Sequence, residues 1–385
     1  MLKPSMTLRS LGVLVCVTVC VLGVREGMTA RAAAQAPKAA AGVPAYQVDP
    51  AWPKTEGNWM FGSIGGIAVD PSNDHVWVLQ RPRTLDNDEN YAAQKPPAAD
   101  CCLPAPPVME FDSAGNFLGG WGGPGPGYDW PENEHGITID YKGNVWIGGN
   151  SKKDNQYLKF TKTGKFLLQI GHPGKSTGSN DTENFNEPTK AFVYAKTNEV
   201  FISDGYINRR VIVFDADTGA FKRLWGAYGK KPDDAAPRTR LFEGPGPEQF
   251  NLVHAVLISN DDLVYVADRT NNRIQVFRPD GTFVKEGFVA REVSTPTGTA
   301  IDLAFSPDSR QQFLYVSSGD QHVRILNRDT LEVLGSFGRL GHYPGQFHHI
   351  HVMAIDSKGN IYTGENTGKR VQKFVFKGLS PASVR

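Results

Sequence analysis

Three of the nine histidines lie within four positions of one short segment, QFHHIHVMAID (346–356), and an apolar run follows them directly. Imidazole is a common ligand of zinc, and a catalytic zinc usually keeps three protein ligands and one open position. A metal site, a histidine-rich loop and the polar mouth of a buried strand would each give this pattern. The equivalent positions elsewhere in the chain are needed to choose between them.

The chain repeats one strand pattern six times. In the clearest copy, residues 253–288, an apolar strand is followed by a polar turn, the strand VYVAD, a loop, the strand RIQVF, the turn PDG and a last strand. Period-2 alternation and turns of Asp, Asn and Gly predict a four-stranded antiparallel unit. Six such units predict an all-β, six-bladed β-propeller. We expect blades over about residues 62–123, 130–174, 185–229, 247–290, 296–341 and 347–378.

The sixth copy has no evident fourth strand after Phe376, whereas AYQVDPAWP (45–53) forms a strand candidate that belongs to no copy. An open sheet edge is exposed to unwanted pairing, and a closed ring removes it. We therefore predict that a strand within residues 45–54 completes the last blade and closes the propeller, which extends over residues 45–380.

The first strand of each blade lines the central channel, and aligning these strands places one residue of each at the channel entrance. These residues are Gly65, His135, Thr189, His254, Ile301 and His351. Histidine thus occurs in the second, fourth and sixth blades, which are one third of a turn apart. Three imidazoles would converge on the axis, which favours a metal site with an open position. The alternative is that these histidines satisfy polar groups around trapped water.

Further polar residues are expected near this entrance. His349 lies two positions before His351 and so on the same strand face, beside the metal or facing a substrate. Arg81, Arg269 and Tyr206 follow second strands, which end where first strands begin. Each alone is typical of a structural role. Beside a metal, they would provide an anion-binding group and an acid or base.

The segment VADRTNNRIQVF (266–277) is close to the signature of NHL repeats. More narrowly, the chain resembles the peptidyl-α-hydroxyglycine α-amidating lyases over roughly residues 60–378, most strongly in 135–147, 187–214 and 250–269. The resemblance implies a zinc ion held by three histidines, a catalytic tyrosine and two active-site arginines. The matching positions are His135, His254 and His351 for the zinc, Tyr206 for the tyrosine, and Arg81 and Arg269 for the arginines.

The resemblance also implies a reaction, cleavage of the C–N bond of a peptidyl-α-hydroxyglycine or related carbinolamide to an amide and glyoxylate. The substrate would be a small peptide or another α-hydroxyglycine-type compound. Tyr206 would act as the base, with one arginine favouring its phenolate form and the other binding the substrate carboxylate. Which arginine has which role is open.

Two positions depart from the family, and two other functions compete with the lyase. Val352 stands where the family has an acidic residue of a structural calcium site, which leaves calcium binding open, and Ile207 replaces a cysteine. A non-catalytic NHL propeller that binds protein or glycan through its loops is the main alternative. A zinc hydrolase on the same scaffold is a third.

The N-terminal residues predict export. Lys3 and Arg9 precede an apolar run over residues 11–24, and small residues follow over 29–36. This order is typical of a signal peptide, here residues 1–34 with cleavage near Ala34. A membrane anchor is the alternative, but the run is shorter than the roughly 20 residues that span a bilayer. We expect a periplasmic or secreted protein without stable membrane insertion, with a disordered tether over 35–44 and a tail over 381–385.

Charge and cysteine content bound the remaining possibilities. The 41 Lys and Arg residues nearly balance the 40 Asp and Glu residues, so no global field favours a nucleic-acid partner. We expect a monomer. Cys101 and Cys102 are adjacent in a proline-rich insert and either pair with each other or remain two thiols.

Overall fold

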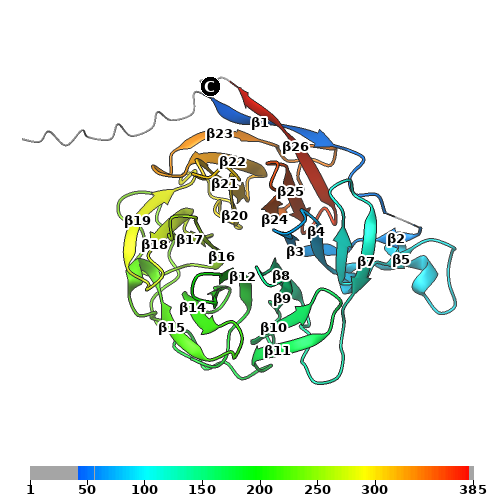
Figure 1. The fold of residues 1–385 in the computed structure, drawn as a ribbon, viewed down its shortest axis with the longest axis horizontal. Helices are drawn as coiled ribbons and strands as arrows, with labels where there is room; N and C mark the ends of the chain where they lie inside the picture. Colours follow the sequence, from blue (N-terminus) through cyan, green and yellow to red (C-terminus); the bar gives the residue numbers. More distant parts are fainter. Residues whose placement is uncertain (1–41, 56, 381–385) are drawn as a thin grey trace, which may run out of the picture. The chain divides into compact units, whose positions relative to one another are not determined.

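The computed structural model describes residues 42–55 and 57–380, and the predicted signal peptide, residues 35–41 of the tether and the tail lie outside them. The last residues of the expected disordered tether, Val43 and Pro44, belong to a strand instead. Six four-stranded antiparallel sheets are arranged around a central channel (Figure 1), which confirms the predicted six-bladed propeller. The first strands β3, β8, β12, β16, β20 and β24 lie closest to the axis in Figure 1.

The first three sheets follow one another along the chain. Their strands are β3 (Ser63–Val69), β4 (Val76–Arg81), β6 (Val108–Phe111) and β7 (Phe117–Trp121); β8 (Glu134–Ile139), β9 (Asn144–Gly149), β10 (Gln156–Thr161) and β11 (Phe166–Gly171); β12 (Pro188–Tyr194), β13 (Glu199–Asp204), β14 (Arg210–Asp215) and β15 (Phe221–Trp225).

The last three sheets continue the ring, and the sixth takes its outer strand from the N-terminal side of the domain. Their strands are β16 (Val253–Ile258), β17 (Val264–Asp268), β18 (Arg273–Phe277) and β19 (Phe283–Phe288); β20 (Asp302–Phe305), β21 (Phe313–Ser318), β22 (His322–Asn327) and β23 (Val333–Phe337); β24 (Ile350–Ile355), β25 (Ile361–Glu365), β26 (Val371–Ser380) and β1 (Val43–Asp49).

The hydrophobic core is divided into six clusters, one between each pair of neighbouring sheets. Between the third and fourth sheets, for example, Phe201, Trp225, Phe250 and Phe277 pack together with less than 4% exposure each. The second strands β4, β13 and β21 are buried at nearly every position. Neighbouring blades cover both faces of such strands, so they read as continuous apolar runs in the sequence.

Strand β1 closes the ring. It pairs with β26 in antiparallel register from Val43 with Ser380 to Asp49 with Lys373, and the two strands lie side by side in Figure 1. Tyr46 fixes the closure, because its hydroxyl is 2.7 Å from that of Tyr315 in the fifth sheet.

The strand ends at Asp49 rather than near residue 54, so the bounds expected from the sequence are corrected here. Pro50 and Pro53 cannot donate to a ladder, and the chain turns after Asp49. Trp52 is instead 4% exposed and packs between the sixth and first sheets, with its ring centroid 4.9 Å from that of Tyr362.

The insert after β4 projects from the side of the ring (Figure 1). It contains the 3-10 helices η1 (Pro82–Thr84), η2 (Asn87–Glu89) and η3 (Tyr91–Ala93), and β5 (Leu103–Pro104), which pairs with β2 (Trp59–Met60). Cys101 and Cys102 form a disulfide with each other. A fourth 3-10 helix, η4 (Ala227–Gly229), follows β15. None of the helices in the described residues is long and apolar enough to cross a membrane.

Candidate metal centre

β-Bulges lie at the channel entrance of the three histidine-bearing first strands. In β16 and β24 the ladder skips one residue, and that residue is His254 or His351. In β8 the skipped residue is Gly136, directly after His135. A bulge bends the strand and re-aims the side chains beside it, so these strands can direct a side chain at the axis that a regular ladder would direct elsewhere.

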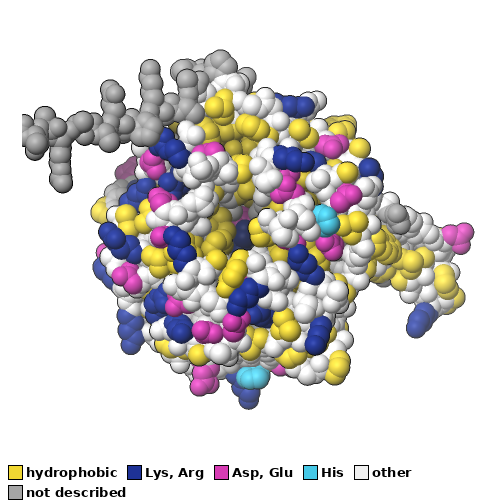
Figure 2. Space-filling model, in the orientation of Figure 1, with side chains coloured by type: hydrophobic (Ala, Val, Ile, Leu, Met, Phe, Trp, Pro, Cys, Tyr) yellow, Lys and Arg dark blue, Asp and Glu magenta, His cyan; other side chains and the backbone are white. Residues whose placement is uncertain are grey.

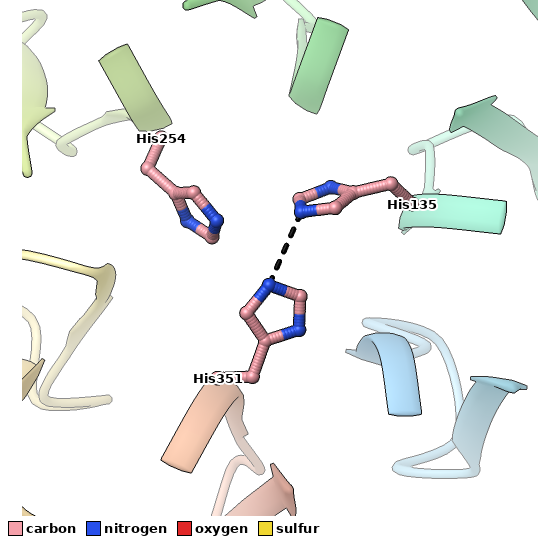
Figure 3. A group of neighbouring side chains, drawn as sticks. All are labelled: His135, His254 and His351. Atoms are coloured by element: carbon pink, nitrogen blue, oxygen red, sulfur yellow. Dashed lines mark hydrogen bonds between the residues drawn. The ribbon is translucent and has the colours of Figure 1, made fainter. Parts of the chain in front are cut away.

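The three imidazoles converge as the sequence predicts (Figure 3). His135, His254 and His351 are 1–2% exposed, and one ligand nitrogen from each lies within 4.8 Å of the others. The Nε2 atoms of His135 and His351 are 3.1 Å apart. Tetrahedral zinc with bonds of about 2.0–2.1 Å holds its nitrogen ligands about 3.3 Å apart, so this pair already has the required separation.

Each ring is oriented by a backbone carbonyl of the next blade. The Nδ1 atoms of the three histidines are 2.9–3.4 Å from the carbonyl oxygens of Thr189, Ile301 and Ile64. A carbonyl only accepts, so Nδ1 carries the proton and the Nε2 lone pair faces the axis. This is the usual arrangement of a metal-binding histidine and its supporting acceptor.

The rings are uncharged in this environment. Burial lowers the pKa of all three histidines well below the ordinary value of 6.5, and the neighbouring Arg81 and Arg269 and the other imidazoles act in the same direction. Two neutral Nε2 lone pairs 3.1 Å apart repel each other unless a cation lies between them. The donor set therefore fits a metal ion bound by three nitrogens.

Tyr206 lies beside the histidines. Its hydroxyl is 3.2 Å from Nε2 of His135 and 3.4 Å from Nε2 of His254. Arg269 donates from Nη1 to this hydroxyl at 3.3 Å and from Nε to the carbonyl of Thr297 at 2.6 Å. One arginine is thus fixed by the backbone and aimed at the phenol.

Arg81 is fixed in the same manner from another blade. Its Nε donates to the carbonyl of Glu134 at 2.7 Å, and its Nη2 donates to Oδ1 of Asn150 at 3.3 Å. Burial lowers the pKa of Arg81, and the negative charge available on Tyr206 and Glu134 opposes that shift. Both arginines are less than 8% exposed, so they present fixed positive charge rather than mobile side chains.

His349 reaches the centre by a route that strand alternation did not predict. It precedes β24 and has a φ of 62°, so the period-2 rule does not apply to it. Its ring centroid still lies 6.0 Å from that of His351. Its Nδ1 is 3.3 Å from the Thr367 hydroxyl, while its buried Nε2 has no hydrogen-bond partner within the described residues.

Val352, which stands where the family has an acidic residue of a calcium site, lies in an apolar environment. Val352 is 5% exposed and packs in the cluster between the sixth and first sheets. In the described part of the chain, the three histidines form the one cluster of His, Cys, Asp and Glu side chains placed to hold a metal ion. The metal site that the described residues offer is therefore one of three nitrogen ligands.

Sequence reasoning missed the groups that orient the site. The carbonyls of Thr189, Ile301, Ile64 and Glu134 carry no side-chain signal. A partial signal existed in the glycines beside the entrance, because Gly inside a strand pattern often marks a bulge or a close backbone approach. Gly136, for example, has a φ of +75°, and a Cβ there would lie 1.9 Å from the Thr189 carbonyl oxygen.

Comparisons with known proteins agree with this architecture. The NHL repeat family matches residues 250–277. The streptogramin B lyase structure aligns with a TM-score of 0.51 and 12% identity, covering 87% of this chain and 98% of that chain. At this identity the likeness supports the propeller fold alone.

Two curated relatives match over longer segments. Human NHL repeat-containing protein 3 is 26% identical over 349 residues, or 86% of this chain and 84% of that protein. Peptidyl-alpha-hydroxyglycine alpha-amidating lyase 1 of Drosophila melanogaster is 26% identical over 278 residues, or 66% of this chain and 47% of that protein. The chain therefore carries an NHL repeat and is a relative of the NHL repeat-containing proteins and the peptidyl-α-hydroxyglycine α-amidating lyases, as its sequence predicted.

Proposed function

We propose that this protein is a metal-dependent lyase that cleaves the C–N bond of a peptidyl-α-hydroxyglycine or a related carbinolamide, releasing an amide and glyoxylate. The observation that carries the proposal is the position of Tyr206. Its hydroxyl lies within 3.4 Å of two converging Nε2 atoms and of the Arg269 guanidinium. An acid or base, a metal-ligand set and a fixed cation thus meet at one channel mouth. The relatives named as α-amidating lyases add support.

The charge of the site favours an anionic substrate. Arg81 and Arg269 are buried beside uncharged imidazoles, and a divalent cation would add further positive charge. A carboxylate next to the scissile carbon, as in an α-hydroxyglycine, would compensate this charge. Arginine can bind a carboxylate through two parallel hydrogen bonds.

The metal would be held by Nε2 of His135, His254 and His351. Zinc suits three imidazole ligands. When bound, it would supply Lewis-acid stabilisation of the negative charge that develops on a substrate oxygen.

Tyr206 would transfer the proton that the reaction moves. Its oxygen takes the proton of the carbinol hydroxyl, and the O–H electron pair becomes the second C–O bond of the aldehyde. The C–N electron pair leaves with the nitrogen, which receives the proton and becomes the amide N–H. Proton transfer by a positioned group of this kind typically contributes about 10²–10⁴-fold in rate.

The structure suggests different roles for the two arginines. Arg269 donates to the Tyr206 hydroxyl and would hold that oxygen in place for the proton transfer. Arg81 does not share this contact and would bind the substrate carboxylate. His349 presents at the same mouth a buried Nε2 that has no hydrogen-bond partner among the described residues, and it would form a hydrogen bond with the substrate.

The test is product analysis with N-benzoyl-α-hydroxyglycine as substrate. Zinc-loaded protein should release benzamide and glyoxylate in equal amounts, and chelation of the metal should stop the release. Retention of one zinc per chain without glyoxylate release would contradict the lyase. The same protein should then be assayed with ester and phosphoester substrates, because a zinc hydrolase is the competing enzyme class.

A non-catalytic binding propeller is the second candidate function. It is consistent with the match to human NHL repeat-containing protein 3, which covers 84% of that protein and whose name assigns no reaction. The same experiment separates the two candidates, since a binding propeller would bind no stoichiometric metal and release no glyoxylate.

A further inference from the structure

Lys190 and Asp302 meet in the channel one residue beyond the histidine-orienting carbonyls. Lys190 directly follows Thr189, whose carbonyl accepts from His135, and Asp302 directly follows Ile301, whose carbonyl accepts from His254. The Lys190 Nζ atom is 2.7 Å from Oδ1 of Asp302. The two side chains are 14% and 2% exposed, so a nearly buried ion pair joins the third and fifth blades.

The Asp302 carboxylate also reaches the sixth blade. Oδ2 accepts from the backbone N–H of Met353 at 2.8 Å, two residues after His351, and Oδ1 accepts from the N–H of Leu303 at 2.8 Å. One carboxylate therefore links the blade that orients His135, the blade that orients His254 and the strand that carries His351.

The ion pair lies directly below the metal centre. A cavity of about 10 Å³ on the axis separates the two, and residues of all six blades contribute to its walls. Its lining includes His135, His254, Lys190, Asp302, Val352 and Gly66. A volume of this size holds at most about one water, so movement of the ion pair transmits to the histidines through packed atoms.

The opposite side of the ion pair has a different character. There the channel widens into a cavity of about 460 Å³ whose walls include Ile67, Ile137, Leu303 and Met353. Figure 2 shows a hollow at the centre of the ring with hydrophobic side chains gathered around it. Lys190 also lines this cavity. Apolar side chains could fill the channel at this level without any buried charge. The ion pair is therefore not needed to close the channel, and its hydrogen bonds to neighbouring blades are its distinguishing feature.

We propose that Lys190 and Asp302 are positioning residues of the metal centre. By joining the third, fifth and sixth blades, the pair holds the Thr189 and Ile301 carbonyls where they fix the Nδ1–H form of His135 and His254. The pair thereby sets the metal affinity without contacting the metal. This inference rests on the metal-binding part of the proposed function and adds two residues to it.

The decisive variant is Lys190→Met/Asp302→Asn, which removes both charges. Replacing both members of a buried ion pair is often close to neutral for stability, so this protein is expected to fold. Zinc affinity, measured by competition with a chromophoric chelator, should fall about 10–100-fold, as for other losses of groups that orient metal ligands. In the Asp302→Asn single variant the zinc affinity should fall at least as far, because the unpaired positive charge of Lys190 remains near the zinc ion.

The matched control is Glu199→Gln/Arg223→Met. In this ion pair the N···O distance is 2.8 Å, and the side chains of Arg223 and Glu199 are 27% and 13% exposed. The pair lies in the third blade, on the strands β13 and β15. The control should fold and leave the zinc affinity within about twofold, because it removes an ion pair that touches none of the histidine-orienting carbonyls. Lys190→Arg, which keeps a cation beside Asp302, should also retain the affinity.

A second readout needs no metal. ¹⁵N NMR of the histidine rings in the metal-free protein should show the Nδ1–H tautomer for the three buried histidines of the parent and a mixture of tautomers in the double variant. Unchanged zinc affinity in the double variant would overturn the proposal, as would unchanged tautomers. Failure of the parent to bind zinc contradicts the proposed function instead, and parent binding is measured first.

Discussion

The even and odd blades contribute different groups to the same centre. At the channel entrance the second, fourth and sixth blades present the side chains of His135, His254 and His351. The third, fifth and first blades present backbone carbonyls, those of Thr189, Ile301 and Ile64, each of which accepts from the ring of the preceding blade. Around the channel entrance, histidine side chains therefore alternate with the backbone carbonyls that orient them.

This difference explains why the centre needs a closed propeller. A histidine on an isolated blade would lack its acceptor, since that acceptor belongs to the next blade. For His351 the acceptor is Ile64, 287 residues earlier in the chain, so the last histidine is oriented only when the ring closes. The identity of the three candidate ligands and their orientation therefore have separate origins, and a substitution can change one without the other.

Removing two of the proposed ligands tests the role of the histidines in the even blades, and it has the largest expected effect on metal binding. His135→Ala/His254→Ala should abolish metal binding, because one histidine cannot replace three in a zinc site. The metal content of the purified protein checks this. His172→Ala/His342→Ala, which removes two exposed histidines, is the control and should keep the metal. Stoichiometric zinc in the first variant would mean that the ligands lie elsewhere.

Tyr206→Phe separates chemistry from metal binding. Loss of the hydroxyl should lower turnover of an α-hydroxyglycine substrate by about 10²–10⁴-fold, the usual contribution of a positioned acid or base, with zinc content unchanged. Tyr343→Phe, at a tyrosine that is 76% exposed, should retain full turnover. Equal activity of the two variants would remove Tyr206 from the mechanism.

Gly136→Ala tests the supporting carbonyls of the odd blades. It disturbs the Thr189 carbonyl of the third blade and removes none of the three histidine side chains. The added Cβ would lie 1.9 Å from the Thr189 carbonyl oxygen and must displace the acceptor of His135. We expect zinc affinity to fall about 10-fold or more. Gly174 has a similar φ of +68° and no atom within 4 Å of an added Cβ. Gly174→Ala thus carries the backbone strain alone and should bind zinc normally.

The pH dependence of the stability of the metal-free protein tests whether the three histidines of the even blades are buried in their neutral form. Its expected effect is the smallest of the four. The folded-state pKa of each of the three histidines is well below 6.5, so below about pH 6.5 the unfolded chain binds protons that the folded chain does not. The stabilisation that these neutral histidines contribute is therefore nearly complete at about pH 7.5 and is lost progressively as the pH falls through the unfolded-state pKa of about 6.5. Between pH 7.5 and 6.5 the free energy of unfolding should decrease by about 0.4 kcal/mol for each histidine.

Urea unfolding of chelated protein at these two pH values measures the decrease. The His135→Ala/His254→Ala variant should show a smaller decrease, since it retains one of the three groups. An equal decrease in that variant would assign the pH dependence to other residues.

Much of the fold could be predicted because its signals are local. Period-2 alternation and turn residues define the strands of each blade, and repetition defines the ring. The end of β1 at Asp49 was missed, because Trp52 continues an apolar pattern but packs between two blades instead of extending the strand. Local patterns report that a side chain is buried and do not report which neighbour covers it.

By itself, the sequence determined that histidine recurs at one register position in alternate blades, and hence that three imidazoles face one axis. Tertiary structure alone decided what orients them: bulges that re-aim the side chains and backbone carbonyls of the following blades. A backbone carbonyl is the same group at every residue, so its role depends entirely on which strand comes to lie beside it. That neighbour is fixed only when the ring has closed.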